Sequence, residues 1–269
     1  MKVPRSLLFG LLVLSLLALA AGGAPWLAPG DPLSQDLAGG LAGPTRPHPL
    51  GQDKLGRDIL SRVLYGAGVS LGVSLTVVLV SSLIGVAVGA LAGYAGGWTD
   101  ELLMRLTDIL LAFPGILLAI ALMAVLGPGV GNVVLALCLM GWVGYARLVR
   151  GQILTLKGRE FVAAAQAAGA GPARTVARHL LPNAFGPVLV QATFGLAAVI
   201  LAEAGLSFLG LGVQPPTPSW GAMLSEGKDF LLVAPHLTLF PGLAIMLAVL
   251  GFNFLGDGLR DLLDPAGRR

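Results

Sequence analysis

Long stretches without any charged residue constrain this chain more than any other feature of its sequence. Five such stretches, each 24 to 38 residues long, contain no Asp, Glu, Lys or Arg. They cover residues 6–30, 63–99, 109–146, 179–202 and 230–256. Because a helix needs about 20 apolar residues to cross the hydrocarbon core of a bilayer, every stretch is long enough to span a membrane.

The longest stretch divides into two spans, because the sequence GPGVGN at residues 127–132 is a strong turn signal. The chain has 12% charged residues, against about 25% in soluble domains. Only helices and closed barrels satisfy their backbone polar groups in lipid, and the alternating pattern of barrel strands is absent. The sequence therefore predicts an all-α integral membrane protein with six transmembrane helices. After the first stretch, the expected spans are 69–95, 109–126, 130–146, 185–206 and 231–255.

The distribution of basic residues predicts the orientation. If the N-terminus faces the cytoplasm, twelve Lys and Arg residues fall in inner segments and five in outer segments. The positive-inside rule therefore places both termini in the cytoplasm. The first 24 residues also have the basic start, short apolar core and small residues of a cleavable signal peptide. Five further spans favour a retained first helix, and N-terminal sequencing would decide.

The sequence divides into four regions. Residues 1–30 hold the cytoplasmic N-terminal end and the first span, and 31–66 form an external loop rich in Pro, Gly and Asp. Residues 67–256 form the core with five spans, and 257–269 form a cytoplasmic tail. Within these regions we expect a short amphipathic helix at 59–68, an internal connector at 96–108 and an external loop at 207–229.

Residues 159–183 differ from the rest of the core, because they combine alanine with basic residues between two apolar runs. Alanine favours a helix over 160–168, the glycines at 169–171 end it, and Pro172 suits the start of a second helix. We expect Pro182 to stop that second helix. An alanine surface suits a hairpin held in a groove of a partner, but a basic amphipathic helix on anionic lipid fits equally well.

The hairpin sequence FVAAAQAAGAGPARTVARHLLPN resembles the cytoplasmic EAA loop of ABC-importer permeases. Four further stretches are similar to the C-type subunit of the dipeptide, oligopeptide and nickel permease family. They are residues 48–71, 141–162, 202–224 and 256–265. Collinear similarity over nearly the whole chain implies a type I (MetI-like) permease bundle, in which the loop docks as a coupling helix into the ATPase subunit.

This resemblance implies a set of residues that contact the ATPase subunit. Ala164, Ala165, Gly169 and Pro182 match the family pattern, whereas Ala163 stands where the family usually carries Glu. That difference removes an expected salt bridge to the ATPase subunit, and Glu160 is an acidic residue three positions earlier. The full set is Glu160, Phe161, Ala163, Ala164, Ala165, Gly169, Arg178, Leu181 and Pro182.

One acidic residue, Glu203, lies in the final turns of the fifth expected span. A carboxylate at membrane depth usually faces a cavity or a partner, which makes Glu203 a candidate residue of the translocation path. A buried structural pair or a group at the membrane interface is the alternative. No phosphate-binding loop, Ser-His-Asp set or HExxH motif is present, and His48 and His236 lack metal-ligand neighbours. We therefore expect no enzyme activity, no cofactor and no metal in this chain.

The resemblance implies one permease subunit of an ATP-driven importer in the cytoplasmic membrane. The implied solutes are di- or oligopeptides or a related small solute, with nickel chelates as an alternative. The implied partners are a second permease, two cytoplasmic ATPase subunits, an external binding protein and membrane lipid, without nucleic acid. A self-sufficient secondary transporter is the rival interpretation, but it predicts ion-coupling carboxylates and helices broken at matching positions of two halves. Glu203 is the one carboxylate that fits this interpretation, and the sequence shows no matching pair of broken helices.

Overall fold

The structure, a computed structural model, describes residues 4–263, and within them it contains helices, turns and loops but no strand. The all-α prediction is confirmed. Lys2, Arg268 and Arg269, which contributed to the predicted orientation, lie outside the described residues. The helices are α1 (Arg5–Gly22), α2 (Ala24–Leu27), α3 (Ile59–Ala95), α4 (Gly97–Leu111), α5 (Gly115–Leu126), α6 (Val130–Lys157), α7 (Glu160–Ala167), α8 (Pro172–Thr175), α9 (Leu181–Phe208), α10 (Trp220–Gly227) and α11 (His236–Leu263).

Five long apolar segments can each cross a membrane by length and hydropathy: α1, α3, α6, α11 and the segment Pro172–Phe208 that includes α9. A sixth candidate is the pair α4 and α5, which is bent by 82° at the break before Pro114. Proline cannot donate a backbone hydrogen bond inside a helix, so the chain breaks there. Six spans are thus present only when the bent pair counts as one.

The prediction of a short connector at 96–108 is wrong, because these residues belong mostly to helix α4. Leu, Met, Glu and Arg are strong helix formers, and an Arg105–Glu101 ion pair of 2.7 Å joins successive turns. Two arginines of α6 also bind α4. Arg150 donates to both carboxylate oxygens of Asp100 at 2.5 and 2.6 Å, and Arg147 pairs with Asp108.

Three other boundaries differ from the sequence-based expectation. The expected short helix at 59–68 is the first part of the unbroken α3, whose first turn is capped by the Asp58 carboxylate accepting from the Ser61 amide at 2.7 Å. The expected external loop at 207–229 contains the short helix α10. Residues 257–263, expected in a tail, continue helix α11.

Close packing between α3 and α6 depends on glycines spaced four residues apart. A methyl group built on Gly93 would lie 2.9 Å from the Ile153 Cβ, and one on Gly89 would lie 2.9 Å from the Val149 Cβ. Without a hydrophobic force between helices in lipid, such small residues allow backbones to approach and pack. The two helices therefore form the central pair of the bundle.

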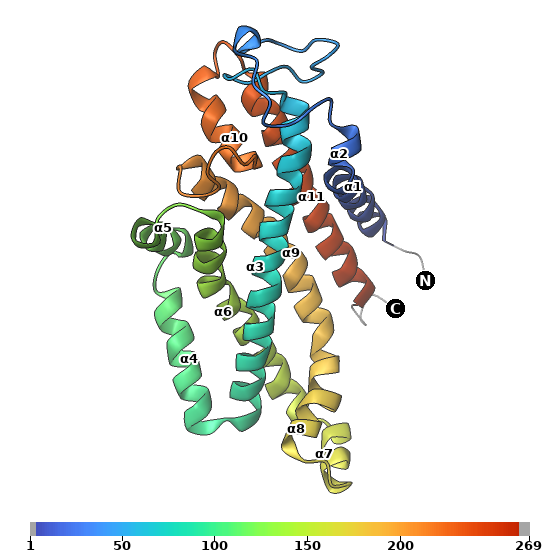
Figure 1. Cartoon of the computed structure of the whole chain (residues 1–269). Helices are drawn as coiled ribbons and strands as arrows, with labels where there is room; N and C mark the ends of the chain where they lie inside the picture. The colour runs from blue at the N-terminus through green and yellow to red at the C-terminus, as the bar shows by residue number, and fades with distance from the viewer. Residues whose placement is uncertain (1–3, 264–269) are drawn as a thin grey trace.

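Figure 1 shows that the loop between α2 and α3 lies at one end of the bundle, and α7 and α8 lie at the opposite end. Helix α1 packs along α11, where a Cβ on Gly258 would lie 2.5 Å from the Leu7 amide nitrogen. The start of α1 and the end of α11 are therefore neighbours (Figure 1). The described part of the chain therefore enters and leaves the bundle on the same side.

Candidate coupling hairpin and buried carboxylate

The candidate coupling hairpin, residues 159–183, consists of α7, a glycine turn, and a second arm formed by α8 and the turn that leads into α9. Its turn is fixed by a helix-terminating pair of hydrogen bonds: the Gly169 amide donates to the Gln166 carbonyl at 2.9 Å, and the Ala170 amide donates to the Ala165 carbonyl at 3.0 Å. This Schellman arrangement needs a left-handed residue at its centre. Gly169 occupies that position with a φ of +84°. The predicted end of the first hairpin helix is confirmed.

Two buried apolar side chains attach the hairpin to the bundle, one on each arm. Val162 of α7 and Leu180 before α9 are both fully buried. They belong to one hydrophobic cluster with Val149 and Ile153 of α6 and with residues of α3. The hairpin is therefore packed in the same cluster as side chains of α3 and α6.

The predicted contact residues of the hairpin mostly face solvent. Phe161 is 41% exposed, and Leu181 and Ala165 are half-buried. The others are exposed: Glu160, Ala163, Ala164, Gly169, Arg178 and Pro182. Alanine side chains cannot reach outward, so the exposed face of α7 offers a smooth surface to a partner.

The prediction that Pro182 stops the second hairpin helix is wrong. Residues Val176–Leu180 form a π-helical turn, in which the Leu181 amide donates to the Val176 carbonyl five residues earlier. Pro182 then lies in the first turn of α9, directly after a turn with an i to i−5 hydrogen bond, so its missing donor interrupts no regular α-helical ladder. The hairpin's second arm therefore continues into a membrane-spanning helix without a break.

An apolar groove of about 450 Å³ lies between the second arm of the hairpin and α3. Tyr94 and Leu91 line it from α3, and Pro172 and Val176 line it from the hairpin. The hairpin is thus fixed by its buried anchors but bordered by space along one side.

The carboxylate of Glu203 is enclosed within the bundle. Its side chain is 1% exposed, and it accepts hydrogen bonds from the Ser207 hydroxyl at 2.7 Å and the Ser70 hydroxyl at 3.2 Å. Ser207 in turn accepts from the Val213 amide at 3.1 Å. This chain alone gives the carboxylate almost no opening to solvent, and its place on a translocation path stays a prediction.

The Glu203 cluster supports a stability prediction. Replacing Glu203 with alanine leaves two buried serine hydroxyls without their acceptor, and we expect a loss of about 1–3 kcal/mol in folding free energy. Thermal unfolding of the detergent-solubilised protein measures this loss. Glu203→Gln retains an acceptor oxygen and is expected to unfold closer to wild type. Equal unfolding temperatures for Glu203→Ala and wild type would contradict the structural role.

Sequence reasoning missed one charged cluster at the end of the bundle opposite the hairpin. Arg57 and Arg62 bind Glu226 there, with nitrogen–oxygen distances of 2.6 and 3.1 Å. The pair Asp53 and Arg57 has a helical i, i+4 spacing that could have indicated a local contact. No sequence signal connects either arginine with Glu226, which lies more than 160 residues away. Among residues 4–263, no group of His, Cys, Asp or Glu could hold a metal ion.

Comparisons with known proteins agree with this architecture. Residues 85–269 match the family model described as "Binding-protein-dependent transport system inner membrane component". The glutathione transport system permease protein GsiD of Escherichia coli O6:K15:H31 is 49% identical over 251 residues, which cover 93% of this chain and 83% of that protein. The dipeptide transport system permease protein DppC of Alkalihalophilus pseudofirmus is 44% identical over 265 residues, covering 98% and 87%.

A solved structure supports the fold independently. The chain is similar to an inward-facing structure of the MetNI methionine ABC transporter with a TM-score of 0.62 at 19% identity, covering 75% of this chain and 96% of that one. At this identity the likeness bears on the fold alone, and it confirms the predicted MetI-like bundle. Together with the apolar helices, the family match places the protein in the inner membrane. The chain belongs to the family of binding-protein-dependent transport system inner membrane components, and the resemblance inferred from its sequence is confirmed.

Proposed function

We propose that this chain is the permease subunit of an ATP-driven importer that moves short peptides, with glutathione and dipeptides as the first candidates. The solute class is supported by the printed names of two relatives, a glutathione permease and a dipeptide permease. This subunit pairs with a second permease, binds two cytoplasmic ATPase subunits and receives solute from an external binding protein. It hydrolyses no ATP itself.

The observation that carries the coupling role is the exposed, firmly anchored hairpin. Its alanine face is open to a partner, while Val162 and Leu180 are fully buried in the cluster shared with α3 and α6. An ATPase subunit that grips α7 therefore moves α6 and α9 as well. We assign Glu160, Phe161, Ala163, Ala164, Ala165, Gly169, Arg178, Leu181 and Pro182 to this contact, with Glu160 as the acidic residue nearest to the position of the missing Glu.

The coupling role fixes the orientation that we propose. The hairpin end faces the cytoplasm, as do both chain ends, and residues 31–66 with α10 face outward. Closure of the ATPase pair pushes on the hairpin, and the cavity between the two permeases then changes its access from one side to the other. This is a two-state shift in which each ligand favours the state that it binds better.

Reconstitution into proteoliposomes tests this function. The chain with its second permease, ATPase subunits and binding protein is expected to accumulate labelled glutathione or a labelled dipeptide only when ATP is supplied. The chain reconstituted alone is the control, and it should accumulate neither solute. Uptake by the chain alone at the rate of the full complex would contradict the proposal. Uptake of neither peptide by an ATP-hydrolysing complex would overturn the solute class.

A further inference from the structure

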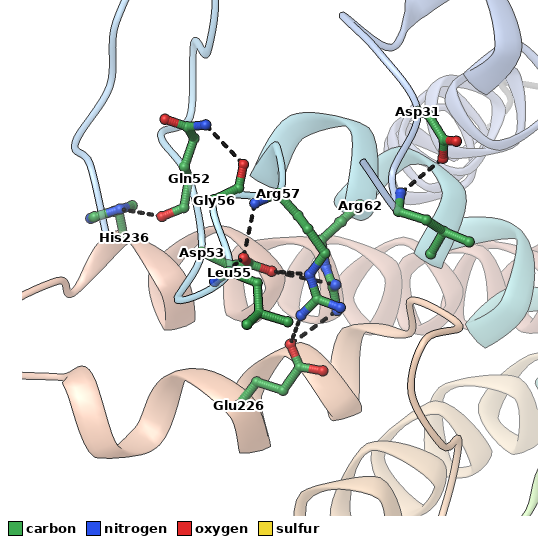
Figure 2. A network of polar contacts seen from close by, with 10 residues as sticks. Asp31, Gln52, Asp53, Leu55, Gly56, Arg57, Arg62, Glu226 and His236 are labelled. Atoms are coloured by element: carbon green, nitrogen blue, oxygen red, sulfur yellow. Dashed lines mark hydrogen bonds and ion pairs between the residues drawn. The ribbon is translucent and has the colours of Figure 1, made fainter. Parts of the chain in front are cut away.

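Figure 2 shows four charged side chains that form a largely buried cluster. Asp53 and Arg57 come from the loop before α3, Arg62 from the start of α3, and Glu226 from α10. The arginine side chains are 3% and 1% exposed, and the carboxylate side chains 8% and 15%. Such burial is unusual for charged groups and occurs when they are paired.

Each arginine lies within ion-pair distance of both carboxylates of this cluster, although the Arg62 Nη1 atom nearest to Asp53 makes no hydrogen bond. Arg57 lies 2.7 Å from Asp53 and 2.6 Å from Glu226, and Arg62 lies 3.3 Å from Asp53 and 3.1 Å from Glu226. The two positive and two negative charges balance. A buried ion network gives little net stability over apolar packing of the same volume. Its main structural consequence is therefore the fixed position of the loop against α10.

Helix α10 is attached at its other end to both long helices. Trp220 is fully buried and its indole N–H donates to the Val63 carbonyl of α3 at 3.0 Å. A Cβ on Gly221 would lie 2.6 Å from the Ala204 Cα of α9. The short helix thus holds α3 and α9 together, and the charged cluster adds the external loop to the same rigid unit.

The same two helices reach the hairpin at the other end of the molecule. Ala90 of α3 and Val188 of α9 share the hydrophobic cluster that contains Val162 and Leu180. Packed helices therefore connect the external loop with the hairpin. A displacement of the loop can reach the hairpin through them if the loop stays fixed against α10.

We propose that Asp53, Arg57, Arg62 and Glu226 form an external clamp, which transmits docking of the binding protein on the outer loop through α10 to α3 and α9. These four are positioning residues, and they contact neither solute nor nucleotide. The clamp rests on the proposed function, because it requires a binding protein outside and an ATPase inside. Without the clamp the loop bends on docking, and the signal is lost before it reaches the long helices.

The test measures ATP hydrolysis by the full complex in proteoliposomes, with and without liganded binding protein. In Glu226→Gln, stimulation by the binding protein is expected to fall about tenfold while the basal rate stays within about twofold of wild type. The matched control is Glu101→Gln, which makes the same change in the exposed Arg105–Glu101 pair of α4, where the side chains are 72% and 60% exposed. That control is expected to keep full stimulation.

A second variant separates transmission from folding. Arg62→Leu with Glu226→Leu restores charge balance, leaves the Asp53–Arg57 pair of 2.7 Å, and is expected to unfold near the wild-type temperature. Its stimulation should nevertheless stay about tenfold reduced. Full stimulation in Glu226→Gln, or its recovery in the double variant, would overturn the clamp. Uptake by the chain reconstituted alone at the rate of the full complex would instead overturn the proposed function, and the clamp with it.

Discussion

Replacing Gly89 with leucine is expected to prevent accumulation of the folded protein. A side chain at this position of α3 would meet the Ala146 carbonyl oxygen and lie 2.9 Å from the Val149 Cβ of α6. These atoms belong to or adjoin the backbone of a packed helix, so they cannot move aside as the end of a flexible side chain can. Overpacking of a core typically costs about 1–3 kcal/mol and occasionally more, a large part of the roughly 5–15 kcal/mol that stabilises a typical protein.

The measurement is size-exclusion chromatography of the detergent-solubilised protein, followed by thermal unfolding. Gly72→Leu is the matched control, because it introduces the same side chain on the same helix at a position where no atom lies within 4 Å of an added Cβ. We expect Gly72→Leu to elute as a single species with wild-type yield. A Gly89→Leu protein with the same profile would show that α3 and α6 are not as closely packed as the structure indicates.

The number of spans could be predicted because charge-free length is almost sufficient to define a helix in lipid. Hydropathy alone was a poorer guide to α4, where Asp100, Glu101 and Arg105 made an amphipathic helix look like a connector. The 82° bend at Pro114 was also not predicted, because a proline marks where a helix can break but does not set the angle between the two parts. The boundary expected at residue 68 was also wrong. Helix α3 continues through the glycines at 66 and 68 without a break.

The hairpin was predictable in its first arm and not in its second. Alanine propensity and the glycine turn define α7 locally, and the structure places the turn at Gly169 as expected. The helix end expected at Pro182 was wrong because a proline is also tolerated in the first turn of a helix, and no local sequence signal indicates the π-helical turn before it. The external cluster was out of reach of the sequence, because Glu226 meets Arg57 and Arg62 only after the whole chain has folded.

Replacing Gly169 with valine is expected to reduce solute uptake about tenfold without reducing membrane insertion. An L-residue in the left-handed conformation costs about 1–2 kcal/mol, and a β-branched side chain is the least suited to it. Since 1.4 kcal/mol corresponds to a factor of ten in an equilibrium, the equilibrium is expected to shift about tenfold away from the native turn of the hairpin. No atom lies within 4 Å of an added Cβ at Gly169, so the spans themselves are undisturbed. Solute uptake and ATP hydrolysis are measured on the same complex in proteoliposomes. We expect ATP hydrolysis to continue while solute uptake falls.

Two variants isolate the backbone effect of this substitution. Gly171→Val places the same side chain two residues away, where the backbone is extended with a φ of −69° and a Cβ again meets no atom within 4 Å. Gly169→Asn keeps the turn, because asparagine tolerates the left-handed region. Both are expected to transport close to the wild-type rate. Normal uptake in Gly169→Val would refute the coupling role of the turn. Equal losses in all three variants would attribute the defect to side-chain bulk in the partner's groove, and the exact backbone path of the hairpin would then be irrelevant to transport.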